Sequence, residues 1–125
     1  TLSAVLWVSL VTVLVAPAGI HLVAALQTLL LMATVEKRAG VSETVQVLCY
    51  ALAPCAFVGV PSVHVQAGVT VWGAGLLVAG IASVHGLSRA TALAVAGIPA
   101  ILVFGYGFGG TEAVLTLVDG LRVLT

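Results

Sequence analysis

The feature that most constrains this chain is an apolar run from residue 2 to residue 35 without a charged side chain. As an α-helix rising about 1.5 Å per residue, this run would be about 50 Å long, more than the roughly 30 Å hydrocarbon core of a bilayer requires. Pro17 lies near its middle, so the run forms either one long tilted or kinked helix or two short segments. We favour one helix, because no charge or turn cluster interrupts it.

Charged residues are too scarce for a water-soluble surface. Only 6 % of the residues are charged and 62 % are hydrophobic, whereas a typical soluble domain has about 25 % charged residues. We therefore expect an all-α protein embedded in the lipid bilayer. The net charge is zero, which leaves no basic patch for nucleic acid.

Three more apolar segments follow the first. They are separated by the polar stretch at residues 36–42, by Pro61 and by Gly86, which are typical of helix ends and aqueous loops. The second contains Pro54 and is the weakest candidate for a membrane span. The four expected transmembrane helices occupy residues 2–35, 43–60, 67–84 and 89–104. Residues 1–110 would then form a transmembrane helical domain, followed by an amphipathic or irregular tail at residues 111–125.

The cations predict an orientation. Lys37 and Arg38 lie after the first expected helix and Arg89 before the fourth, so with four spans both groups lie on one side of the membrane. The positive-inside rule places loops 36–42 and 85–89 in the cytoplasm and both chain ends outside. An even number of spans with an outside start also predicts a further helix before Thr1.

Small residues recur four apart on the third and fourth expected helices. Such spacing lets helix backbones approach closely in lipid, where dispersion drives packing. The pattern predicts that these helices pack against each other or a partner, although a chain this rich in Ala and Gly also produces such spacings by chance. The candidate packing residues are Gly75, Ala79, Ser83, Ala92, Ala96 and Ala100.

Few polar residues interrupt the apolar segments, and the candidates for an intramembrane role are His21, Gln27, Gln46, Tyr50 and the helix-breaking Pro54. An ionisable side chain at mid-membrane is a functional candidate. For His21 we favour the simpler alternative, an interhelical hydrogen bond to Gln46 or Tyr50.

The sequence contains none of the residue patterns that typify catalytic sites. It has no paired carboxylates, nucleophile–base pair or phosphate loop, and its three histidines lack the spacing of a metal site. We therefore expect no enzymatic activity, no cofactor and no bound metal.

Several short motifs, taken in order, resemble the Yip family of multi-pass membrane proteins (Ypt-interacting proteins), particularly members encoded by halophilic archaea. The motifs are His21-Leu22, Ser-Glu-Thr at 42–44, Tyr-Ala-x-Ala-Pro at 50–54, His-Gly-Leu-Ser at 85–88 and the Ala-rich stretch 90–99. The resemblance implies a five-helix fold with a cytoplasmic N-terminus, of which this chain would lack the first helix. Eukaryotic members are linked to Rab-type GTPases through a cytoplasmic N-terminal region that these residues do not include, so the resemblance implies a fold more than an activity.

We therefore expect a non-enzymatic Yip-like membrane protein that acts through helix–helix association, with a protein partner or as a homo-oligomer. The alternative is a small oligomeric transporter or channel component. A transporter should have a continuous polar path near His21, Gln46 and Tyr50. An assembly protein should have a dry bundle with an apolar face left for a partner.

Overall fold

The computed structural model describes residues 1–123, and this part of the chain contains helices and no strand. Three helical stretches are long and apolar enough to cross a membrane: Leu2–Thr34, Val63–His85 and Arg89–Gly107. A fourth apolar stretch, Val41–Phe57, is shorter. The expected all-α class is confirmed, and three rather than four segments reach the length of a membrane span.

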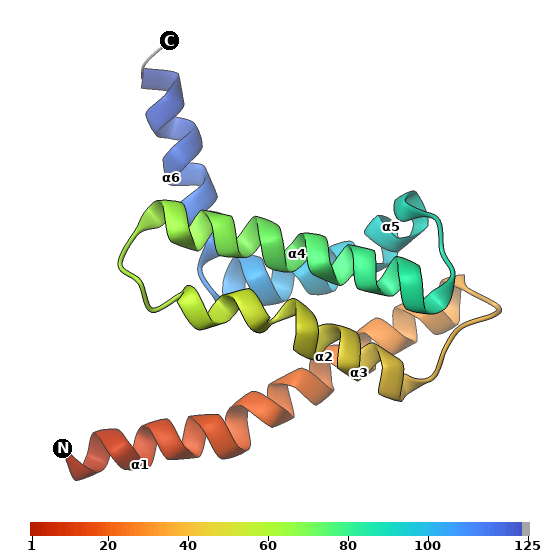
Figure 1. Cartoon of the computed structure of the whole chain (residues 1–125), viewed down its shortest axis with the longest axis horizontal. Helices are drawn as coiled ribbons and strands as arrows, with labels where there is room; N and C mark the ends of the chain where they lie inside the picture. Colours follow the sequence, from red (N-terminus) through yellow and green to blue (C-terminus); the bar gives the residue numbers. More distant parts are fainter. Residues whose placement is uncertain (124–125) are drawn as a thin grey trace.

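The first apolar run is one continuous helix rather than two segments. It consists of α1 (Leu2–Leu10), a π-helical turn η1 (Val11–Val15) and α2 (Ala16–Thr34), and the backbone stays right-handed helical at both joints. Pro17 cannot donate a backbone hydrogen bond, and a wider π turn is a common local adjustment to such a loss. Figure 1 shows this helix leaving the bundle at α1, while α2 contributes Ala24, Gln27 and Leu31 to the buried core.

Pro54 divides the second apolar segment. The α-helix α3 (Val41–Ala51) ends before it, and the chain continues as the 3-10 helix η2 (Ala53–Phe57), with Pro54 buried. A proline removes the backbone donor that the preceding turn needs, so a tighter turn replaces the α-helix. The helical segment expected at 43–60 therefore runs from 41 to 57 and changes type at its middle.

The third and fourth apolar segments form a helical hairpin. The helix α4 (Val63–His85) starts four residues before the expected residue 67, and Gly86 ends it with a φ of 63°, a left-handed conformation that favours glycine. The Ser88 side chain then accepts a hydrogen bond from the backbone N–H of Thr91 and caps α5 (Arg89–Ala100). A second π-helical segment, η3 (Ile101–Gly107), continues α5.

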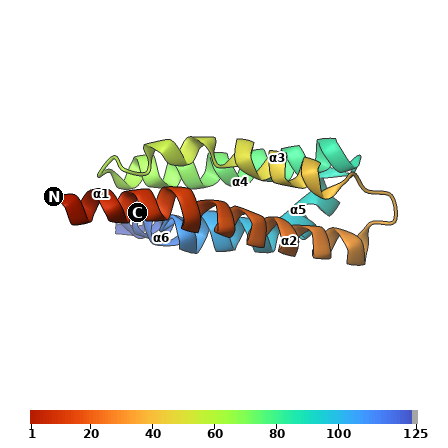
Figure 2. The ribbon, with the colours of Figure 1, turned by 90° about the horizontal axis from the view of Figure 1, so that it is seen from below.

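The bundle is organised around α4. This helix contacts α3 and η2 on one side, and α5, η3 and the C-terminal helix α6 (Gly110–Val123) on the other, while α2 packs against α3 and α5 (Figures 1 and 2). Residues 111–123 of the expected tail thus form a helix, which projects from the end of the bundle in Figure 1, and the last two residues of that tail lie outside the described part of the chain. The largest buried apolar side chains are Leu31, Leu48, Leu77, Ile81 and Phe104.

Two glycines let α4 approach its neighbours closely. A Cβ atom added at Gly80 would lie 2.6 Å from Cγ1 of Val47 on α3, and one added at Gly73 would overlap the Phe104 ring of η3. Gly75, in contrast, has open space where its Cβ would lie. Because helices in lipid associate through close van der Waals contact, Gly73 and Gly80 set the spacing of the bundle.

Replacing Gly80 with Leu should lower the free energy of unfolding by about 1–3 kcal/mol, because α3 and α4 must move apart to fit the side chain. Gly75→Leu on the same helix is the matched control and should change stability by less than about 0.5 kcal/mol. Unfolding in mixed detergent micelles, followed by circular dichroism, measures both. Equal stabilities of the two variants would contradict the close approach at Gly80.

Candidate functional site

The polar residues expected inside the membrane do not gather at one place. The His21 side chain is exposed, and its Nδ1 atom lies 2.8 Å from the carbonyl oxygen of Pro17, one turn earlier in the same helix. The expected interhelical hydrogen bond from His21 to Gln46 or Tyr50 is therefore wrong. Because a carbonyl can only accept, Nδ1 carries the proton of the neutral ring, and Nε2 is left as an acceptor directed away from that bond.

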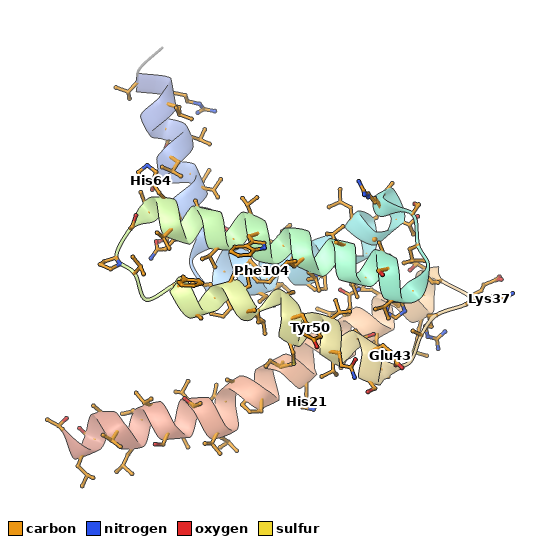
Figure 3. All side chains as sticks on the ribbon, viewed as in Figure 1. His21, Lys37, Glu43, Tyr50, His64 and Phe104 are labelled. Carbon is orange, nitrogen blue, oxygen red and sulfur yellow. The ribbon has the colours of Figure 1, made fainter. Side chains whose placement is uncertain are left out.

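Gln46 and Tyr50 lie one turn apart on the exposed face of α3, and the side chain of Tyr50 is 76 % exposed. Tyr50 lies near the C-terminal end of α3, and Figure 3 shows His21 on the helix below it. These side chains are thus on the outside of the chain, and none of them lies in a polar path through the bundle.

Gln27 is the exception, and its partner explains why it is buried. Its Nε2 atom donates to the carbonyl oxygen of Val95 across 3.4 Å, joining α2 to α5. In an α-helix that carbonyl would accept from the N–H of the residue four positions later, which here is Pro99 and has no N–H. The Gln27 side chain supplies the donor that Pro99 removes from its own helix.

The other end of the Gln27 amide has no such role. Its Oε1 atom is buried without a hydrogen-bond partner in the described chain. The hydrogen bond to Val95 is the polar contact that Gln27 contributes to the fold. It links one position of α2 to one position of α5 along the helix axes. In lipid, hydrogen bonds of this kind contribute on average about 0.6 kcal/mol.

A second buried polar contact lies at the C-terminal end of α4. The backbone N–H of Ala39 donates to Nδ1 of His85 at 3.1 Å, so the proton of the neutral ring is on Nε2. Nε2 lies 3.3 Å from Oγ1 of Thr44, which itself donates to the carbonyl oxygen of Gly40. With both ring nitrogens used and only 6 % of the residue exposed, His85 fastens the α2–α3 loop and α3 to the end of α4.

The sequence does not indicate this role for His85. Its position directly before the Gly86 helix end, together with the expectation that loops 36–42 and 85–89 share one side, could have paired it with the polar loop. The contact lies between residues 46 positions apart, and no local pattern indicates which loop atom the ring meets.

The small residues separate into two groups. Ala92, Ala96 and Ala100 are buried in the bundle, whereas the α4 series is exposed. The α4 series lines a groove of about 880 Å³ between α4 and α5, whose wall residues include Gly75, Val78, Ala79, Ser83, Leu93 and Ile101. Arg89 lies at one end of this groove.

Three of the four basic residues, Lys37, Arg38 and Arg89, lie at one end of the bundle, whereas Arg122 lies on α6. The Ala39–His85 hydrogen bond brings the loop that carries Lys37 and Arg38 to the end of α4, and Arg89 follows four residues after His85. In Figure 3, Lys37 and Glu43 are at this end, and His64 lies near the opposite end of α4. All three cations are exposed.

The described residues contain no group of three His, Cys, Asp or Glu side chains that could hold a metal ion. Comparison with known protein families, with characterised proteins and with solved structures finds no match for this chain. The resemblance to the Yip family therefore stays a prediction.

The bond from Gln27 to Val95 can be tested with a double-mutant cycle. Gln27→Leu should destabilise the protein that has Pro99 and cost less in a Pro99→Ala background, where the new N–H of residue 99 can bond to Val95. We expect a coupling energy of about 0.5–1.5 kcal/mol from unfolding in micelles. Gln46→Leu, at an exposed position, should show no coupling to Pro99→Ala. A coupling near zero for Gln27 would show that Pro99 does not depend on it.

The His85 contacts make a separate prediction. His85→Phe keeps a large ring but leaves the Ala39 N–H without an acceptor, so we expect faster hydrogen exchange across residues 38–40 and a loss of about 1–3 kcal/mol in unfolding free energy. Hydrogen-exchange mass spectrometry of the intact protein measures the first effect. His64→Phe, at the exposed start of α4, is the control and should leave exchange in this loop unchanged. Unaltered exchange in His85→Phe would show that the ring does not hold the loop.

Proposed function

We propose that this protein is a non-enzymatic, Yip-like multi-pass membrane protein that works by helix–helix association, and that α1 with η1 is its docking element. One observation carries the proposal: no residue of α1 or η1 is buried, although both belong to the longest apolar helix of the chain. Figure 1 shows α1 extending away from the part of this helix that packs on the bundle.

The exposed stretch also carries polar groups suited to a partner. An apolar side chain loses little by facing lipid, but a hydroxyl or imidazole in the membrane gains from a hydrogen-bonding neighbour. Ser9 is exposed on α1, and His21, further along the same helix, offers Nε2 as an acceptor. A second copy of this chain or another membrane protein could supply the complementary donors.

The transporter alternative receives no comparable support. His21, Gln46 and Tyr50 are on the outside, and the buried polar groups Gln27 and His85 are engaged in contacts that hold helices together. A bundle whose interior is apolar and whose buried polar side chains bond to neighbouring helices and loops fits an assembly role better than a conducting path.

We infer a topology of four crossings, with α3 and η2 as the short one. At about 1.5 Å per residue in α3 and about 2.0 Å in η2, Val41–Phe57 reaches roughly 27 Å, close to the thickness of the hydrocarbon core. The end of the bundle that carries Lys37, Arg38 and Arg89 would face the cytoplasm, and the C-terminus would lie outside.

The docking role of α1 can be tested by site-specific photo-crosslinking in native membranes. A photoreactive side chain is placed in turn at each position from 4 to 15. We expect adduct yields that rise and fall every three to four residues, because a docked helix buries one face. A product of twice the chain mass would identify a second copy, and another mass a different partner. A probe at Ile98, exposed on α5, gives the background, and a flat profile at that level would contradict the proposal.

A further inference from the structure

The groove between α4 and α5 has an apolar interior. Its floor is formed by half-buried small side chains of α4, and its far wall by Leu93, Gly97 and Ile101 of α5. The groove exists because α4 presents Gly75, Ala79 and Ser83 here, which are too small to fill the space next to α5. The two helices are in contact and are joined at Gly86, and Figure 1 shows α5 passing behind α4.

The groove ends at an unpaired cation. Arg89 lines it, and the Arg89 side chain has no hydrogen bond or ion pair within residues 1–123. Arg89 is also the first residue of α5, where the positive end of the helix dipole disfavours a cation and favours an anion. An anion at this position would therefore be stabilised both by the guanidinium group and by the helix end.

The dimensions of the groove fit one lipid chain. From Arg89 to Ile101 the helix rises about 18 Å, close to the roughly 15 Å thickness of one leaflet of hydrocarbon. The length of the groove, its apolar lining and the single cation at its end match one acyl chain with an anionic headgroup.

We propose that this groove binds an anionic phospholipid, with one acyl chain along Gly75, Ala79 and Ser83 and the phosphate on Arg89. The apolar length and the single terminal cation are complementary to the two parts of such a lipid. Clusters of basic residues between helices at the membrane surface bind anionic headgroups by the same attraction. The inference rests on the membrane location of the proposed function but does not depend on docking through α1.

The experiment uses the full chain purified in a neutral detergent and counts bound lipids by native mass spectrometry. Three ligands are titrated: phosphatidylglycerol, phosphatidylcholine with the same acyl chains, and glycerol phosphate without chains. We expect one phosphatidylglycerol molecule per chain, bound about fivefold more tightly than phosphatidylcholine, which is the effect of one Arg contact with an anionic headgroup. Glycerol phosphate should not bind, because it lacks the chain that fills the groove.

Two kinds of variant separate the contribution of the lipid headgroup to binding from that of the acyl chain. Arg89→Gln should remove the preference for phosphatidylglycerol and leave phosphatidylcholine binding unchanged. Gly75→Leu should weaken the binding of both lipids at least fivefold, because the leucine side chain enters the groove. The variant should still fold, because a Cβ at this position meets no other atom of the protein. Ala79→Leu is a second groove-filling variant. The matched controls are Arg122→Gln on α6 and Gly68→Leu on the exposed side of α4, outside the groove, and both should bind like the unaltered chain.

The proposal would be overturned if the unaltered chain bound both lipids equally, or if Arg89→Gln kept its preference. Lipid binding that survives in both folded groove-filling variants would also overturn it. A dimer that is lost in Gly75→Leu while lipid binding persists would place a second copy in the groove instead. None of these outcomes alters crosslinking from positions 4 to 15, so failure of this inference and failure of the α1 docking role are distinguishable.

Discussion

The bundle depends on the rule that a backbone carbonyl buried away from water must find a donor within the protein. Pro99 breaks this rule inside α5 by leaving Val95 without its helical partner, and Gln27 of α2 restores it. The same requirement explains the π turn before Pro17 and the 3-10 helix at Pro54, where the chain changes its own helical geometry. Within residues 1–123, the repair comes from another helix only at Pro99, so this proline helps to determine how two helices are positioned.

Packing around α4 depends on glycines, which have no side chain and therefore let neighbouring residues approach the helix backbone. Gly80 admits Val47 of α3, and Gly73 admits the ring of Phe104, so α4 contacts two neighbours at van der Waals distance. At the basic end, the two nitrogens of His85 bind the α2–α3 loop and α3. These contacts give the bundle a defined core, and α1 and the groove next to Gly75 and Ala79 are two of the surfaces that remain open.

The two open surfaces have different chemistry. The exposed part of the first helix is apolar around its circumference with scattered hydroxyl groups, as expected of a surface for another helix. The groove is lined by small and apolar residues and ends at Arg89, an arrangement complementary to the acyl chain and headgroup of the proposed anionic lipid. A protein of this kind would be held to a partner by one surface and to the membrane's own lipids by the other.

The sequence alone determined the all-helical class, the presence of segments apolar enough to cross a membrane and the ends of these segments near Thr34 and Gly86, because hydrophobicity, charge and helix-ending residues act within a few neighbouring positions. The tertiary structure decided which polar groups meet. The Gln27–Val95 bond joins residues 68 positions apart, and the choice of Gly73 and Gly80 rather than Gly75 as contact sites depends on where Phe104 and Val47 lie. Helical spacing shows which residues share a face, but only the packed neighbours determine which face is buried.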